Sequence, residues 1–544
     1  MITQKTIQEA QKLIGLDIPP AAQERLVPML EAQLAGLTAF RALPLDQHAQ
    51  PACRFDPRLP GRDFPVQADH VRLKQDPAPA LPLSDQDIAF APVVHLSHWL
   101  AGGQITSRRL TEIYLDRIAR LDGLLASYIT VTSDLALGQA DACDAELAQG
   151  RRRGPLHGVP YGIKDVFDTE GVPTSWGSAL FRDRVSTSDA TIVTMLRDAG
   201  AVLLGKLGTG ELANGSAWYG GDVMNPWNRE EAAGGSSSGS AAAVAAGLCG
   251  FAIGTDHLGS ILNPADRCGV VGLRATFGRI PSKGDMPMAP SLARIGPLCR
   301  RVEDAALVLA AIKGPDPSSL TSFDHGFAYD ADIDLSGIKI GYSPDWFQRI
   351  GYAPEAATPV MAGHLQGLEA MRALGAELVE VVLPEFPYML LAAICFVESA
   401  AVLEDLVLDG EGALISGWPD LWRQARLTSA VDYVQLDRLR HQLMSAMDRL
   451  FAQVDLLFAP AYGNFNLLLA TNLTGHPGLT LRTGFGEIAT RSLYGQPLDP
   501  QGPKHRVTAN LTLHGRLFEE GKILAVARAL EDQLDVWAER PPGF

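Results

Sequence analysis

A short apolar run that follows an amphipathic helix constrains the fold of this chain more than any other feature. Residues 191–198 place apolar side chains at helical spacing, and Asp189 is a suitable N-cap for that helix. The chain then passes through Ala199-Gly200 into residues 201–204 (AVLL), which suit a strand buried on both faces. A helix that leads into a fully buried strand is typical of α/β layers, so we expect an α/β protein.

The same alternation recurs along the chain. The spacing of apolar residues predicts helices at 107–121, 134–149 and 355–374, and strands at 161–164, 251–254, 338–342 and 377–382. A length of 544 residues would allow two to four domains, but no linker is evident after residue 83. We therefore expect one main domain over residues 83–544.

The N-terminal residues read differently. Two helices are predicted at about Thr6–Ile14 and Ala21–Phe40, separated by Pro19-Pro20, because proline suits a first helical turn but not a helix interior. Residues 43–83 are rich in proline and lack periodicity, which indicates an extended strap. Residues 1–82 are thus predicted to form a helical arm and a proline-rich strap.

Composition restricts the partners and the compartment. The net charge is −16, and an acidic surface repels nucleic acid and anionic membranes. The uncharged stretches 232–255 and 456–481 are too short in their apolar part, or too interrupted by proline and asparagine, to span a bilayer. The first residues lack a secretory apolar core, and the six cysteines are scattered without a C-x-x-C pair. We expect a cytoplasmic protein with buried free thiols, and no nucleic-acid or membrane partner.

Lys164 is the first candidate catalytic residue along the chain. It lies among Val159, Tyr161 and Ile163, where a charged side chain would be costly. Burial lowers the pKa of a lysine from about 10.4, sometimes by several units, and the neutral amine can then act as a base. A surface lysine beside a solvated Asp165 is the alternative, because most lysines are exposed.

Two serine-containing segments can supply the group that such a base activates. Residues 234–240 (GGSSSGS) precede the alanine-rich residues 241–247, so a glycine-serine loop with unpaired N–H groups enters a helix. In residues 254–261 (GTDHLGSI), the glycine before Ser260 permits a tight turn. Successive N–H groups from His257 to Ser260 are candidates to stabilise an oxyanion. Either segment by itself could instead be a structural cap or turn.

Together these three segments resemble the amidase signature family of serine hydrolases. That family has a G-x-K-D lysine, a glycine-serine loop and a G-T-D-x-x-G-S-I segment, with its two serines at the 24-residue spacing of Ser236 and Ser260. The flanking residues 225–228 (NPWN), 268–274 (CGVVGLR) and 296–297 (GP) also match. The resemblance is close over about residues 90–315, which would be the core catalytic region, and weaker beyond.

The resemblance implies a single α/β/α domain around a large mixed β-sheet. It implies that Ser260 is the nucleophile, that Ser236 is the middle serine held through a cis peptide, and that Lys164 is the base. A serine hydroxyl is a poor nucleophile until a neighbour takes its proton, so Lys164 would deprotonate Ser236, which would deprotonate Ser260. Ser260 would thus form an acyl-enzyme, and water would then release the acyl group. No metal or other cofactor is needed.

The predicted oxyanion turn departs from the family pattern. By the resemblance, the oxyanion or the substrate would be bound by His257, Leu258, Gly259 and Ser260. Leu258 stands where the family often has a second glycine, and His257 replaces a commoner small or apolar residue. His257 could titrate at about pH 6 to 7 and tune the site, or it could be a loop residue that points away.

The expected reaction is hydrolysis of a carboxamide-type C–N bond in a small molecule. Urethane, urea-type and ester bonds are alternatives, because the same nucleophile attacks them. A further alternative is the amidase-like component of an amidotransferase complex, which the N-terminal extension suggests. A homodimer is also an expectation. Aromatic residues that could line an acyl pocket or simply belong to the core are Trp346, Phe347, Phe396, Trp418, Trp422 and Phe465.

An α/β-hydrolase is a rival interpretation. Residues 235–239 (GSSSG) match the G-x-S-x-G pattern formally. That nucleophile elbow needs a strand directly before it, whereas residues 228–233 (NREEAA) read as a loop. A phosphate-binding loop is disfavoured too, because no Gly-Lys-Ser/Thr ending follows the glycines.

Overall fold

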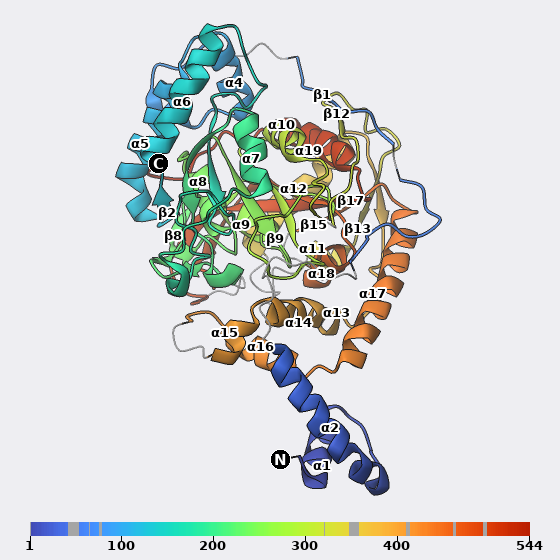
Figure 1. Cartoon of the computed structure of the whole chain (residues 1–544). Coiled ribbons are helices and arrows are strands. Elements are labelled where there is room, and N and C mark those ends of the chain that lie inside the picture. Colours follow the sequence, from blue (N-terminus) through green and yellow to red (C-terminus); the bar gives the residue numbers. More distant parts are fainter. Residues whose placement is uncertain are drawn as a thin grey trace.

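The computed structural model describes residues 2–41, 54–64, 66–75, 79–319, 321–347, 358–409, 414–460, 464–492 and 498–544. Its helices and strands are labelled in Figure 1. Cys53 lies outside these residues, whereas the five other cysteines are free and buried. None of the described helices is long and apolar enough to cross a membrane.

A large mixed sheet forms the centre of the molecule. In the described chain its eleven strands follow the order β14 (Glu377–Glu380), β13 (Lys339–Tyr342), β15 (Leu456–Pro460), β17 (Lys504–Gly515), β16 (Gly478–Ala489), β10 (Val271–Arg274), β11 (Arg294–Cys299), β9 (Phe251–Asp256), β3 (Pro160–Lys164), β4 (Val202–Leu207) and β2 (Tyr128–Val131). Parallel pairs join β9, β3 and β4, while β9, β11, β10, β16 and β17 pair antiparallel. The predicted α/β class with a mixed sheet is confirmed.

Helices lie on both sides of this sheet (Figure 1). Before and around the central strands the chain forms α3 (Asp85–Ala89), α4 (Val93–Ala101), α5 (Ser107–Leu121), α6 (Ser133–Ala148), α7 (Thr191–Asp198), α8 (Ser238–Ala245), α9 (Leu262–Cys268) and α10 (Val302–Ile312). Later it forms α11 (Pro344–Phe347), α12 (Thr358–Ala373), α13 (Tyr388–Leu391), α14 (Ala393–Val402), α15 (Glu404–Asp409), α16 (Trp418–Arg426), α17 (Ala430–Phe451), α18 (Phe465–Leu473) and α19 (Glu520–Leu534). Apolar side chains from both layers meet the sheet in one continuous core.

The local predictions hold where periodicity is strong. Helices α5 and α7 have the predicted bounds, and β3 and β4 are buried along their whole length. The predicted N-cap of α7 is wrong, because Ala190 occupies that position without a side-chain cap. Asp189 instead accepts a hydrogen bond from the Glu170 N–H at 2.8 Å and pairs with Arg197. Residues 355–357 of the predicted 355–374 helix lie outside the described residues.

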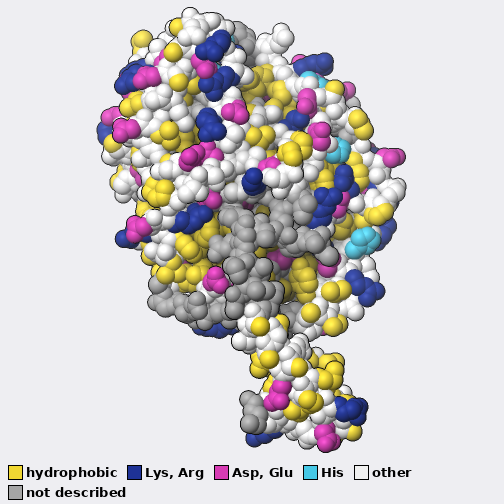
Figure 2. All heavy atoms as spheres, viewed as in Figure 1, with side chains coloured by type: hydrophobic (Ala, Val, Ile, Leu, Met, Phe, Trp, Pro, Cys, Tyr) yellow, Lys and Arg dark blue, Asp and Glu magenta, His cyan; other side chains and the backbone are white. Residues whose placement is uncertain are grey.

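The N-terminal arm consists of α1 (Gln4–Leu13) and α2 (Pro20–Arg41), which project from the body in Figure 1. Apolar side chains are visible on the arm in Figure 2; those of Leu13 and Met29 are exposed. The strap is less irregular than predicted, since β1 (His70–Arg72) pairs in parallel with β12 (Ala328–Asp330). The division of the chain at residue 82 stays a prediction.

Candidate active site

Lys164 occupies the last position of β3, between the parallel strands β4 and β9. It is fully buried. Its Nζ lies 2.7 Å from Ser236 Oγ and 2.9 Å from Thr255 Oγ1. The central position of β3 explains the burial, because strands on both sides remove the side chain from water. Lys164 and Ser236, remote in sequence, are therefore in direct contact.

The electrostatic environment favours the neutral amine. Burial lowers the pKa of Lys164 to about 7, although Asp285 and Asp256 act in the opposite direction. Burial also raises the pKa of Asp285 to about 8, against the influence of Lys164. Desolvation thus shifts both groups toward their uncharged forms. A lysine with this pKa can accept a proton near neutral pH.

Ser236 is held in a loop that is hydrogen-bonded to β9. The peptide bond between Gly235 and Ser236 is cis. The Ser237 hydroxyl donates to the Thr255 carbonyl at 3.0 Å and accepts from the Thr255 N–H at 3.2 Å. Helix α8 begins directly afterwards, at Ser238. These contacts fix Ser236 next to the strand end that carries Thr255.

Ser260 lies in the turn that follows β9. Its carbonyl accepts a hydrogen bond from the Ser237 N–H at 3.1 Å, which places the turn against the Ser236 loop. Ser260 is partly exposed, whereas Ser236 is buried. Within the described residues, no hydrogen bond joins the Ser236 and Ser260 hydroxyls. Of the two hydrogen bonds expected for the relay, the one between Lys164 and Ser236 is therefore present. The one between Ser236 and Ser260 is not formed in this structure.

Asp256 shapes the turn around Ser260. Its carboxylate accepts the N–H groups of Gly259 at 2.7 Å and Ile261 at 2.8 Å. Gly259 has φ +106, and a Cβ there would meet Leu468 Cδ2 at 2.7 Å, so the turn requires glycine. The expectation that all N–H groups from His257 to Ser260 face an oxyanion is wrong for Gly259, whose N–H is already used. The N–H groups of Leu258 and Ser260 donate to no other described residue.

His257 is buried beside these groups and does not point into solvent. It is 3% exposed, and neither ring nitrogen has a hydrogen-bond partner among the described residues. Burial, reinforced by Lys164, lowers the pKa of His257 to about 3. Of the two alternatives for His257, titration near pH 6 to 7 is disfavoured, because a pKa lowered to about 3 keeps the ring neutral over the working range.

A His257→Ala variant tests whether His257 titrates in the working pH range. We expect the midpoint of its rate–pH profile to match that of the wild type, because the removed ring carries no charge above about pH 5. The measurement is kcat/KM from about pH 5 to pH 9 on one substrate. A displaced midpoint would return His257 to the titrating groups of the site.

Three functional candidates escaped the sequence interpretation. Thr255 contacts the lysine amine, Asp256 orders the turn, and Asp285 influences the pKa of Lys164. Thr255 and Asp256 stood in the G-T-D segment, so their proximity to Ser260 was a usable signal. Asp285 lies in the residues 282–285 (SKGD), which carry no pattern that points to the site.

The aromatic candidates for an acyl pocket mostly lie in the core. Trp418 and Trp422 are buried and stacked with ring centroids 5.6 Å apart, and Phe396 meets Trp418 edge-on at 6.2 Å. Trp346 and Phe347 are buried in α11. Phe465 is partly buried at the first position of α18. Their assignment to a pocket stays a prediction.

The segment before the serine loop is a strand and not the predicted loop. Residues Asn228–Ala232 form β8, which pairs with β7 (Met224–Asn225) in a separate two-stranded sheet. A nucleophile elbow would follow a strand of the main sheet and expose Ser237. Ser237 is buried, with its hydroxyl bonded to the backbone of β9. The geometry therefore disfavours the α/β-hydrolase interpretation.

Comparison with known proteins shows the family of the chain. The amidase family model matches residues 109–473, about two thirds of the chain. The chain belongs to the amidase signature family. This amidase is 34% identical over 494 residues to the A subunit of the glutamyl-tRNA(Gln) amidotransferase from Roseiflexus sp. (strain RS-1), covering 82% of this chain and 96% of that protein. Membership makes the chain an enzyme of the class that cleaves amide C–N bonds.

Solved structures share the fold of this amidase. The native peptide amidase from Stenotrophomonas maltophilia is 31% identical, with a TM-score of 0.71, over 84% of this chain and 98% of that one. A bacterial aryl acylamidase of the amidase signature family has a TM-score of 0.72 over 84% of this chain and 99% of that one. Its sequence identity is 22%, so it supports the fold alone.

Proposed function

We propose that this amidase hydrolyses a small-molecule carboxamide through an acyl-enzyme on Ser260. The observation that carries the proposal is the fully buried Lys164, 2.7 Å from Ser236 Oγ, with a pKa of about 7. A buried lysine that forms no ion pair with a described residue and has a lowered pKa can serve as a base. The neighbouring turn offers Ser260 at a partly exposed position, where a substrate can reach it.

The proposed reaction begins with proton transfer through the two serines. Neutral Lys164 takes the proton of Ser236, which takes that of Ser260, and Ser260 Oγ attacks the carbonyl carbon. The relayed proton returns to the leaving nitrogen as the C–N bond breaks. Water then attacks the ester, giving its proton to the same relay, and the acid leaves. The open link between Ser236 and Ser260 would close by rotation of the Ser260 side chain, since catalytic hydrogen bonds often tighten only with substrate bound.

The oxyanion would rest on backbone donors of the Ser260 turn. The N–H groups of Leu258 and Ser260 supply the proposed contacts. The Gly259 N–H instead donates to Asp256 and stabilises the turn. Removing one such donor from a hydrolase typically lowers kcat by about 10²- to 10³-fold. Leu258 and the buried His257 stay proposed substrate contacts.

If Lys164 is the base, its pKa determines the pH dependence of the reaction. Only the neutral amine can accept the proton, so the rate rises with pH through the Lys164 pKa of about 7 and then reaches a plateau. At pH 6, roughly one tenth of the lysine is neutral, so kcat/KM should be about tenfold below the plateau. The measurement is kcat/KM against pH. A rate that falls as pH rises through this range would contradict a lysine base.

Trapping of the acyl-enzyme tests the proposed function. The full chain is incubated with a panel containing a primary amide, an anilide, a urethane and an ester, quenched in acid, and digested for mass spectrometry. We expect the acyl group of a hydrolysed substrate on the peptide that carries Ser260. Consumption of substrate with no adduct on that peptide would overturn the proposal. The panel also separates amide from urethane and ester preference.

A role within an amidotransferase complex is a second candidate function. The 34% identity to the amidotransferase protein of Roseiflexus, over 96% of its length, favours it. Copurification of a second polypeptide from the native host, with no hydrolysis by the chain alone, would support this function over a free-standing amidase. The homodimer stays a prediction, and light scattering of the purified full chain tests it.

A further inference from the structure

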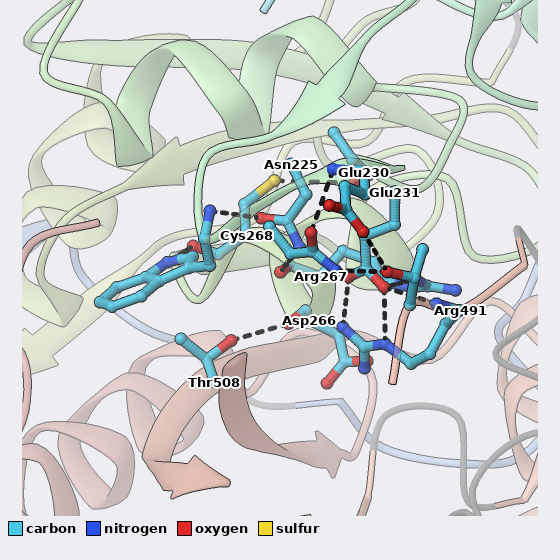
Figure 3. Close-up of polar contacts among 12 residues, drawn as sticks. Asn225, Glu230, Glu231, Asp266, Arg267, Cys268, Arg491 and Thr508 are labelled. Carbon is cyan, nitrogen blue, oxygen red and sulfur yellow. Dashed lines mark hydrogen bonds and ion pairs between the residues drawn. The ribbon is translucent and has the colours of Figure 1, made fainter. Parts of the chain in front are cut away.

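A buried charged cluster lies beside the serine-bearing segments and is not used by the proposed reaction. Its members are Asn225 of β7, Glu231 of β8, Arg267 of α9 and Arg491, which follows β16. We call these four residues the Glu231 clasp. Figure 3 shows their side chains converging on the Glu231 carboxylate. Three segments that are far apart in the sequence therefore meet at one carboxylate.

Arg491 makes the strongest contact of the clasp. Its Nη2 donates to Glu231 Oε1 at 2.6 Å, and its Nε donates to Oε2 at 3.1 Å (Figure 3). The Arg491 backbone N–H donates to Oε2 as well, at 2.9 Å. This bidentate arrangement fixes the direction of the Glu231 side chain as well as its distance.

Asn225 and Arg267 extend the contact to the nucleophile side. Asn225 Nδ2 donates to Glu231 Oε1 at 2.9 Å and to the Arg267 carbonyl at 3.0 Å. Arg267 Nη1 lies 3.4 Å from Glu231 Oε2. Its Nη2 donates to the carbonyl of Ser492. The last turn of α9 is thus tied to β8 and to the residue after Arg491.

The clasp spans the two segments that carry the serines. Glu231 precedes Ser236 by five residues, and Arg267 follows Ser260 by seven. A further bond joins the same segments, since the Gly235 N–H donates to Asn263 Oδ1 at 2.8 Å. The position of the Ser236 loop relative to α9 therefore depends on these side chains.

The Glu231 side chain is charged and shielded from water. Burial alone would raise its pKa, but Arg491 and Arg267 lower the pKa of Glu231 to about 2. A neutral residue at this position would leave two buried guanidinium groups without their shared counter-charge. Asp266 also acts on both arginines, but losing the Glu231 ion pair weakens the contacts that hold them in place, because a buried charge is costly when it loses its ion pair.

We propose that the Glu231 clasp is a positioning device that sets the spacing between Ser236 and Ser260 for the proton relay. The inference rests on the proposed function and deepens it. Ser236 is held to Lys164, while its link to Ser260 is open in this structure, so that link depends on how the two segments are placed. A displacement of about 1 Å in a reacting pair can lower a rate roughly 10²-fold.

Labelling by a fluorophosphonate tests the clasp without knowledge of the substrate. Ser260 Oγ forms a bond to phosphorus, the P–F bond breaks with release of fluoride, and the relay takes the serine proton. Saturation kinetics separate the maximal labelling rate from the half-saturating concentration. For Glu231→Gln we expect a maximal rate about 10- to 100-fold lower with an unchanged half-saturating concentration. Arg491→Lys, which keeps the charge but loses the bidentate contact, should lie between it and the wild type.

Glu531→Gln is the matched control. Glu531 is also buried, pairs with Arg301 Nε at 2.9 Å and accepts the Val302 N–H at 3.1 Å. These partners lie at the start of α10, beyond the end of β11 that is remote from Arg294, the residue opposite Asp256 in the strand pair beside the Ser260 turn. Both glutamate variants should lower the unfolding temperature, but the labelling rate per folded molecule should fall only in Glu231→Gln.

The outcomes separate the two proposals. If the wild type is not labelled on Ser260, the proposed function fails. If the wild type is labelled and Glu231→Gln reacts at the same maximal rate per folded molecule, the clasp has only a structural role. An equal loss of rate in Glu531→Gln would also overturn the proposal, because any buried ion pair would then have the same effect.

Discussion

Ser260→Ala should lower the turnover of every amide that the wild-type enzyme hydrolyses by about 10⁴-fold or more. Without the hydroxyl no acyl-enzyme can form, and the remaining rate comes only from binding and from the backbone donors of the turn. Ser260 is partly exposed, and its hydroxyl makes no hydrogen bond to a described residue. We therefore expect the variant to fold normally, and kcat/KM measured beside a thermal unfolding curve checks both statements.

Two outcomes would contradict this prediction. Equal hydrolysis by the variant and the wild type would exclude Ser260 as the nucleophile. Loss of activity in Ser237→Ala, with activity kept in Ser260→Ala, would instead support the nucleophile elbow of an α/β-hydrolase. The buried Ser237 hydroxyl, bonded to the Thr255 backbone, makes the second outcome hard to reconcile with this structure.

Lys164→Met should lower kcat/KM by about 10³- to 10⁴-fold at pH 8, where the wild-type amine is mostly neutral. Methionine has a similar length and fills the buried site, but it cannot accept a proton. The loss should not be recovered at any pH, because no titrating group replaces the amine. The measurement is the rate–pH profile from about pH 6 to pH 10, taken with the unfolding temperature.

The stability of Lys164→Met distinguishes a catalytic role from a structural one. Burial lowers the pKa of Lys164 to about 7, which means that burying this amine does not stabilise the folded protein. An apolar replacement should therefore leave the unfolding temperature unchanged or raise it. Activity within about tenfold of the wild type would exclude Lys164 as the base. A large drop in unfolding temperature would show that its contacts to Ser236 and Thr255 hold the fold together.

The Glu231 clasp and the Asp256 turn suggest how the site is organised. Strand β9 carries Thr255 toward the lysine and Asp256 toward the turn, so one strand end orders both the proposed base and the proposed nucleophile. Arg274 and Arg294 counter the effect of burial and lower the pKa of Asp256, which keeps this carboxylate ionised. In the proposed mechanism, charged groups outside the relay thus place the uncharged groups within it.

Local patterns were enough to predict several elements and the burial of Lys164. The bounds of α5 and α7 followed from apolar periodicity, which depends on neighbouring residues alone. The apolar neighbours of Lys164 likewise indicated a buried lysine, and its burial is confirmed. The N-cap of α7 and strand β8 were missed, because Asp189 bonds to Glu170 and β8 pairs with β7, contacts that local propensity does not encode.

The sequence by itself determined which candidate groups the proposed site contains and which segments carry them, since residue identity and short-range periodicity are local properties. Only the tertiary structure decided how those groups behave. The pKa of Lys164 depends on the strands packed on both sides of β3. The Gly259 N–H donates to Asp256 because the path of the turn brings the two groups together. Glu231, Arg267 and Arg491 meet only after the sheet has formed, because desolvation and pairing of charges depend on distances in space.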